Sequence, residues 1–173
     1  ETRRIRAAAA AGKGLVVFLG KDLAAGTLAD LGLEGVVPTR ETSLAALSPT
    51  PAAGPMAEAI NWRAAPQIGP RYALEGSGLE TLIATDADDS EAVVAEARVG
   101  TGRCFLITPD LSEPANRPFL EWPYFNYLVY RLTAAAAGVE PLDYAAYPGS
   151  PVPHGPLKTT ILLGVALLLA GTV

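Results

Sequence analysis

The side chains that could do chemistry gather around the end of one predicted strand, within residues 100–121. Arg103 opens the apolar run RCFLI, and Asp110 and Asn116 follow where that strand ends. Open α/β sheets place ligand sites at the carboxyl ends of their strands. Asp110 and Asn116, joined by Arg103, are therefore the candidate ligand-binding residues. Turn formation and helix capping are the alternative, and we favour it, because Asp and Asn readily hydrogen-bond their own backbone.

The sequence offers no set of residues suited to catalysis or metal binding. Cys104 lies inside an apolar strand, whereas a nucleophilic cysteine needs an exposed turn and a nearby base. The single histidine, His154, lies in a proline-rich stretch, where we interpret it as an exposed loop residue rather than a contact to a partner or a lipid headgroup. The acidic turn at 86–89 lacks the glycine and the later glutamate of a calcium loop. We predict no enzyme activity, no cofactor and no metal.

The charge of the chain excludes one class of partner. The formal net charge is −5 and the sequence pI is about 4.9. Nucleic-acid binding needs clustered Lys and Arg, and the only basic cluster is Arg3, Arg4 and Arg6. On a helix, such a cluster is more often a solvated face than a polyanion site. Nucleic acid is therefore not an expected partner.

The elements that must position these residues alternate between helix and strand. The run LVVFL has the continuous apolar character of a strand buried in a parallel sheet. Gly12 and Gly138 are each expected to end a helix. Asp22 is expected to cap the start of another helix, which Gly32 ends. Residues 34–72 show no clear period and suggest a loop with one short helix. The expected strands are 15–19, 79–86, 92–100 and 103–110, and the expected helices are 2–11, 23–32 and 119–138.

The C-terminal stretch has a different composition. Residues 159–173, TTILLGVALLLAGTV, carry no charge and suit a hydrocarbon environment. Fifteen helical residues would reach about 22 Å, less than the roughly 30 Å of a bilayer core, so we predict a truncated transmembrane helix. A buried C-terminal helix is the alternative. The predicted organisation is an α/β domain at 1–138, a proline-rich linker at 139–158 and a membrane span at 159–173.

Aromatic residues are concentrated in the last predicted helix of the domain. Trp122, Tyr124, Tyr127 and Tyr130 lie within a short segment, and some of them must belong to the core. Aromatic side chains are enriched in the hot spots of protein interfaces. Those that remain outside the core are the predicted partner interface.

Two segments resemble a known family. TRRIRAAAAAGKGLVVFLG is similar to the opening of class I glutamine amidotransferase-like domains, and EAVVAEARVGTGRCFLITPDLS resembles their end in bacterial membrane-anchored proteins, including relatives of the aerotolerance and von Willebrand-type membrane proteins. Gly100, Gly102, Arg103, Asp110 and Asn116 occupy matching positions. The resemblance implies a three-layer, flavodoxin-like α/β fold with a mostly parallel sheet. The family's Gly-x-Cys-x-Gly turn is absent here, so its catalysis is not carried over.

These observations predict a non-catalytic, membrane-anchored scaffold, which acts as an accessory or assembly subunit of a larger membrane complex. A bioenergetic electron-transfer complex is one candidate. The expected partners are other subunits of that complex and, through residues 159–173, the lipid bilayer. By analogy with domains on stiff stalks, the α/β domain is expected on the extracytoplasmic, periplasmic side. The alternative function is a small-ligand sensing or binding module at the C-terminal strand edge.

Overall fold

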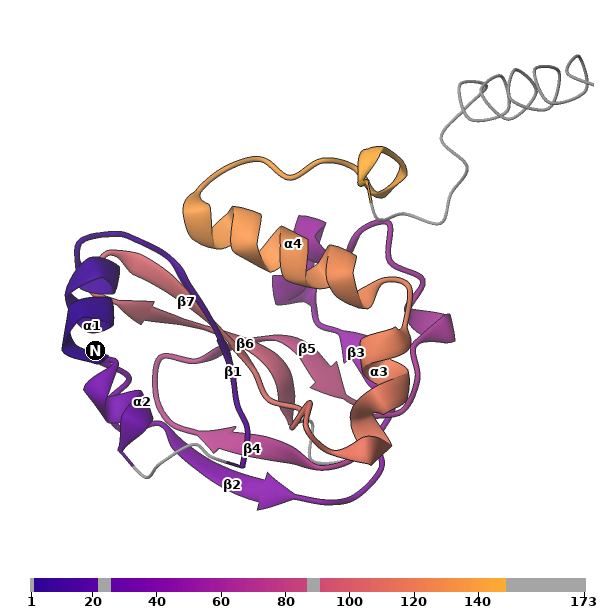
Figure 1. Ribbon diagram of the computed structural model, residues 1–173, viewed down its shortest axis with the longest axis horizontal. Helices are drawn as coiled ribbons and strands as arrows, with labels where there is room; N and C mark the ends of the chain where they lie inside the picture. Colours follow the sequence, from indigo (N-terminus) through magenta and orange to yellow (C-terminus); the bar gives the residue numbers. More distant parts are fainter. Residues whose placement is uncertain (1, 22–25, 87–90, 149–173) are drawn as a thin grey trace, which may run out of the picture.

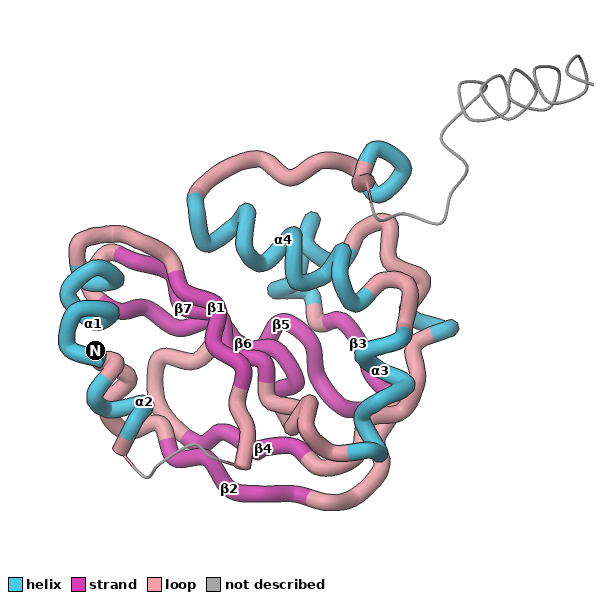
Figure 2. Tube along the Cα trace, viewed as in Figure 1, coloured by secondary structure: helices cyan, strands magenta, loops and turns pink. Residues whose placement is uncertain are grey.

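A computed structural model describes residues 2–21, 26–86 and 91–148, which form a sheet with elements packed on both of its faces (Figure 1). Helices and strands alternate only at the start of the described chain, and four strands then follow one another before the last two α-helices (Figure 2). Four short 3-10 helices, labelled η, complete the described elements. The elements are α1 (Thr2–Ala10), β1 (Leu15–Phe18), α2 (Thr27–Asp30), β2 (Val37–Glu41), β3 (Leu47–Pro49), η1 (Pro51–Ala57), η2 (Trp62–Ala64), β4 (Arg71–Glu75), β5 (Glu80–Thr85), β6 (Ala92–Val99), β7 (Gly102–Ile107), η3 (Pro114–Asn116), α3 (Arg117–Glu121), α4 (Phe125–Ala137) and η4 (Tyr144–Ala146).

The sheet is mostly antiparallel, which corrects the predicted mostly parallel, flavodoxin-like arrangement. In the described residues the main sheet has the strand order β1-β7-β6-β5-β3, and only β1 and β7 pair in parallel. The reason lies in the connections. A turn at Gly100 and Thr101 links β6 to β7, and so short a link reverses the chain, whereas a parallel pair needs a long crossover. Gly100 has φ 60°, a conformation that glycine adopts without strain.

Strand β1 also differs from its prediction. It does form where the apolar run indicates, but it is an edge strand and not a central one. Its residues are half-buried or exposed, and the Phe18 side chain is 44% exposed. A continuous apolar run predicts the strand correctly and says nothing of its place in the sheet.

Two hydrophobic cores lie on opposite faces of the sheet. Along β7, Phe105 and Ile107 face a core that α4 and α3 cover, whereas Cys104 and Leu106 face a core that α1 and α2 cover. This alternation follows from the two-residue period of a strand. A separate two-stranded ribbon, β2 paired antiparallel with β4, completes the second face and lies opposite α4 in Figure 1.

Proline divides the predicted helix 119–138 into α3 and α4. Trp122 has an extended ψ of 127°, which is the conformation that a following proline imposes. Pro123 thus ends α3, and α4 begins two residues later. The predicted stop at Gly138 is confirmed, since this residue caps α4 in the left-handed conformation. Helix α4 packs closely on the start of β1, where a side chain at Gly14 would lie 2.1 Å from the Ala136 carbonyl oxygen.

Part of the predicted organisation lies beyond the described residues. The predicted membrane span 159–173, His154 and the predicted helix cap Asp22 all fall outside them. Among the described helices, none is long and apolar enough to cross a membrane. Residues 139–147, at the start of the predicted linker, pack against α4 through Tyr144 and Tyr147.

Candidate functional site

The carboxyl ends of β1 and β7 lie side by side because these strands pair in parallel, and a cavity of about 460 Å³ opens there. Its polar lining comes from Lys21, Thr27, Asp110 and Ser112. Phe18 supplies an exposed apolar surface beside them. This is the edge at which the sequence predicts a ligand site.

Asp110 is buried at this edge and its carboxylate is engaged within the chain. Its Oδ1 accepts hydrogen bonds from the backbone N–H of Ser112 at 3.1 Å and from the Ser112 hydroxyl at 2.7 Å. Its Oδ2 lies 3.5 Å from Arg40 of β2, which also pairs with Glu113. The hydrogen bond that Arg40 donates to the Glu113 carboxylate raises the pKa of Arg40. Asp110 therefore closes a turn and ties the β2–β4 ribbon to the loop after β7.

Asn116 is fully buried and acts as a cross-link between two loops. Its Oδ1 accepts a hydrogen bond from the Gly69 N–H at 2.7 Å. Its Nδ2 donates to the carbonyl oxygens of Pro70 at 2.7 Å and Asp110 at 2.9 Å. These bonds satisfy both the oxygen and the nitrogen of the amide, so the side chain joins the loop that precedes β4 to the loop that follows β7.

Arg103 does not join Asp110 and Asn116. It lies at the opposite end of β7, seven positions away, which corresponds to roughly 23 Å along a strand. There its guanidinium makes two 2.7 Å hydrogen bonds to the Glu96 carboxylate and lies over the Phe105 ring. The Glu96 hydrogen bond raises the pKa of Arg103. The structure thus brings together two of the three predicted ligand-binding residues.

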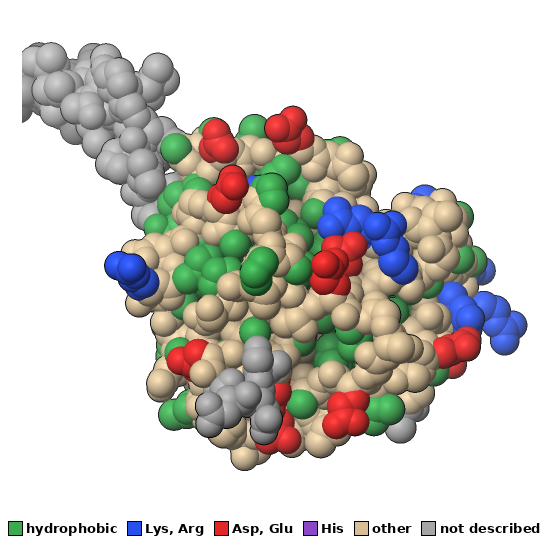
Figure 3. All heavy atoms as spheres, turned by 180° about the vertical axis from the view of Figure 1, so that it is seen from behind, with side chains coloured by type: hydrophobic (Ala, Val, Ile, Leu, Met, Phe, Trp, Pro, Cys, Tyr) green, Lys and Arg blue, Asp and Glu red, His purple; other side chains and the backbone are tan. Residues whose placement is uncertain are grey.

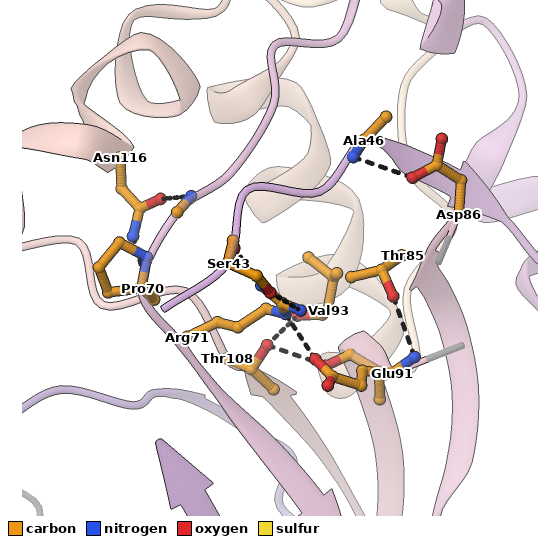
Figure 4. Close-up of polar contacts among 12 residues, drawn as sticks. Ser43, Ala46, Pro70, Arg71, Thr85, Asp86, Glu91, Val93, Thr108 and Asn116 are labelled. Atoms are coloured by element: carbon orange, nitrogen blue, oxygen red, sulfur yellow. Dashed lines mark hydrogen bonds and ion pairs between the residues drawn. The ribbon is translucent and has the colours of Figure 1, made fainter. Parts of the chain in front are cut away.

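A buried arginine that the sequence analysis did not single out organises the same edge (Figure 4). Arg71, at the start of β4, is 2% exposed, and its Nε donates to Glu91 at 2.6 Å. Its Nη1 donates to the Ser43 carbonyl oxygen at 2.7 Å. Nearby, the Thr108 hydroxyl donates to the Ala92 carbonyl oxygen at 2.9 Å. No local pattern around Arg71 reveals this burial, because its partners come from distant segments.

The single cysteine is placed for packing and not for reaction. Cys104 is fully buried in the middle of the sheet, and burial raises the pKa of its thiol to about 11. A thiolate nucleophile needs the opposite shift and an accessible position. In the part of the chain that the structure describes, no group of three or more His, Cys, Asp and Glu residues could hold a metal ion. From the acidic turn, Asp86 accepts a hydrogen bond from the Ala46 N–H at 3.0 Å.

The predicted interface aromatics divide between the core and the surface. Trp122 and Tyr127 are buried, whereas Tyr124 and Tyr130 are half-buried. Tyr144, from the segment after α4, stacks on Tyr124 with ring centroids 4.6 Å apart and meets Tyr127 edge-on at 4.9 Å. The chain's own C-terminal segment therefore covers part of the aromatic surface of α4.

The charges on the molecular surface are mixed on the face that Figure 3 shows. Acidic and basic side chains are scattered over that face, and apolar side chains are exposed between them. Several exposed arginines are paired, such as Arg6 with Glu34 at 3.1 Å and Arg117 with Glu121 at 2.7 Å. A continuous positive track of the kind that binds nucleic acid is not seen on this face.

Comparisons with known proteins give a fold likeness only. No protein-family model matches the sequence, and no curated protein matches it. Two solved structures are similar in fold, the cytoplasmic proteins STM1381 from Salmonella typhimurium LT2 (TM-score 0.60, 15% identity) and STM3548 from Salmonella typhimurium (TM-score 0.62, 12% identity). Each likeness covers 79% of this chain and 60% of the other protein, so this chain spans about 60% of their length.

These findings correct the predicted membrane anchor and the predicted periplasmic-side location. Both solved structures of similar fold are described as cytoplasmic proteins, and none of the helices within residues 2–148 that the structure describes could cross a membrane. The prediction came from residues 159–173, which lie outside the described residues, and from analogy with stalked domains. Membrane anchoring therefore has no part in the function proposed below.

Proposed function

We propose that this α/β domain is a non-catalytic scaffold that acts by binding other proteins, as an accessory or assembly subunit of a larger complex. The observation that carries the proposal is the state of the polar groups at the strand ends. Asp110 and Asn116 occupy the edge where open α/β sheets place their reactive groups, and their polar atoms are engaged by the chain itself. The single cysteine, Cys104, is buried.

The surface beside α4 is the part that best suits a protein partner. We define the α4 surface as Tyr124, Tyr130, Val139 and Leu142. Val139 is 58% exposed and Leu142 is 50% exposed, and the Tyr130 hydroxyl accepts a hydrogen bond from the Leu142 N–H at 2.9 Å. Half-buried tyrosines beside exposed aliphatic side chains are the composition that protein interfaces favour.

Site-specific photo-crosslinking tests this proposal in the native host. A photoreactive phenylalanine analogue replaces Leu142 in the full chain, and the matched control places it at Leu44, which is 65% exposed elsewhere on the domain. We expect a covalent adduct of defined mass from position 142 and none from position 44. If position 142 yields no adduct and the purified full chain has the mass of a single copy, the proposal fails.

A second candidate function is small-ligand binding at the ends of β1 and β7, and the cavity of about 460 Å³ favours it. Thermal-shift screening with sugars, nucleotides and divalent ions would find such a ligand. Lys21→Ala is the informative variant, because Lys21 is exposed and lines the cavity. Replacing Asp110 would instead disturb the turn that it closes. A stabilising compound that acts equally on wild type and Lys21→Ala would count against this site.

A further inference from the structure

A second cavity, on the α4 side of the sheet, contains an arginine with no anionic partner. Arg131 of α4 is only 7% exposed. Its Nη1 donates to the Tyr127 hydroxyl at 2.8 Å and its Nη2 donates to the Pro55 carbonyl oxygen at 2.6 Å, so both partners are neutral. Its Nε–H is buried and has no hydrogen-bond partner among the described residues.

The other buried or half-buried arginines of the sheet are compensated. Arg71 pairs with Glu91 at 2.6 Å, and Arg103 pairs with Glu96 at 2.7 Å. Within the described residues, Arg131 forms no ion pair with any Asp or Glu. Its guanidinium carbon lies 5.5 Å from the centre of the Tyr127 ring, which offsets only part of the cost of burying a charge. Buried charges in proteins are normally paired, because leaving water is expensive for an isolated ion.

Arg131 and Arg103 line the same cavity, which has a volume of about 470 Å³. Most of the remaining walls are apolar, formed by η1, the end of α4 and the residues that follow it. These walls consist of Ala52, Ala53, Pro55, Met56, Ala135, Gly138, Val139 and Pro141. The volume falls in the range of small-molecule sites, and such sites combine apolar walls with a few polar groups that orient the ligand.

We propose that this cavity binds a small organic acid, with its carboxylate on Arg131 and its apolar body against the alanine, proline and valine walls. The charges select a monoanion. Arg103 is compensated by its ion pair with Glu96 and by the nearby charge of Glu80, so Arg131 supplies the one positive charge of the cavity that has no anionic partner among the described residues. A planar carboxylate matches the fork of N–H donors that a guanidinium presents, and the apolar walls suit an organic body better than a hydrated phosphate.

The test uses benzoate as the probe and the full chain as the protein. Benzamide serves as the uncharged control of the same shape, and inorganic phosphate as an anion without an apolar body. We expect millimolar benzoate to raise the unfolding temperature, and benzamide and phosphate to have no such effect. In the ¹H–¹⁵N spectrum of the arginine side chains, the Arg131 Nε–H signal, assigned by its loss in Arg131→Lys, should move with benzoate, while that of Arg117 should not.

A variant at an exposed wall residue keeps the test independent of folding defects. Val139→Glu places a carboxylate beside the cavity, where it competes with the probe, and Val139→Gln is the neutral control of similar size. Because a charged hydrogen bond is worth about tenfold or more in affinity, Val139→Glu should bind benzoate at least that factor more weakly than Val139→Gln, which loses only the apolar contact of the valine. An unmoved Arg131 signal at saturating benzoate, or equal affinities in the two variants, would overturn the proposal.

Discussion

Replacing Asn116 by alanine separates its two interpretations, as a ligand-binding residue and as a structural cross-link. The substitution removes three short hydrogen bonds, two donated by Nδ2 and one accepted by Oδ1. A buried hydrogen bond contributes about 1 kcal/mol, and the Gly69 N–H left without a partner costs about 1–2 kcal/mol more. The free energy of unfolding should therefore fall by about 4 kcal/mol, which is large for a single polar residue.

Equilibrium unfolding in urea, followed by tryptophan fluorescence, measures this loss. The midpoint should fall while the slope with denaturant stays unchanged, because the substitution alters stability and not the surface exposed on unfolding. Asn126→Ala is the matched control, since Asn126 is exposed on α4 and should change stability by less than about 0.5 kcal/mol. A loss below about 1 kcal/mol for Asn116→Ala would refute the cross-link and return the residue to the list of candidate ligands.

Three further predictions follow from the buried polar and aromatic groups. Glu91→Gln should lower the free energy of unfolding by about 3–5 kcal/mol, because it leaves the Arg71 charge buried without an anion. Glu121→Gln, in an exposed ion pair, is the control and should lower it by about 0.5 kcal/mol or less, and urea unfolding midpoints measure both. Burial raises the pKa of Cys104 from 9.0 to about 11, so the neutral thiol contributes its full stabilisation, up to about 3 kcal/mol, below pH 9. This contribution is lost as the pH rises from 9 through 11. The difference in unfolding free energy between wild type and Cys104→Ala, measured across this pH range, should fall accordingly. Tyr144→Ala removes two ring contacts to α4 and should expose residues 139–147 to protease before the domain itself is cut, a difference that limited proteolysis with mass spectrometry would detect or disprove.

Local signals in the sequence were enough for several elements. Apolar runs predicted β1, β5, β6 and β7, and positive-φ glycines at 12 and 138 ended α1 and α4 as expected. The mostly parallel sheet that the family resemblance implies is wrong, because the tight turn between β6 and β7 makes that pair antiparallel. Turn length is the better guide to strand direction, since a short link permits only antiparallel pairing.

The ribbon β2–β4 had no local signal at all. Its strands pair Val37 with Glu75 and Glu41 with Arg71, and they are separated by β3, η1 and η2. Both strands are five residues long and include charged residues, so neither forms a long apolar run. Pairing between distant, polar edge segments is set by tertiary contacts, here by Arg40 reaching Asp110 and Glu113, and such contacts cannot be derived from spacing.

The candidate site was half predictable for a related reason. Asp110 and Asn116 lie close in sequence after one strand, so their proximity depends on that local segment and not on contacts with distant parts of the chain. Arg103, the third predicted residue, lies at the other end of the same strand, and a strand holds its two ends apart. The burial of Arg71 depends on Ser43 and Glu91, which reach it from other parts of the chain.

The two surfaces proposed for binding meet at the segment after α4, and this links their functions. Gly138, Val139 and Pro141 form one wall of the Arg131 cavity, while Leu142 belongs to the α4 surface and Tyr144 anchors the same segment on α4. A ligand that contacts this wall binds more tightly when the segment is docked, so ligand binding favours the docked segment. Thermodynamic linkage makes the effect reciprocal: a partner that binds the docked segment raises the affinity of the cavity for its ligand, and a partner that binds the undocked segment lowers that affinity. A scaffold built in this way would report the presence of an organic acid to whatever protein it holds.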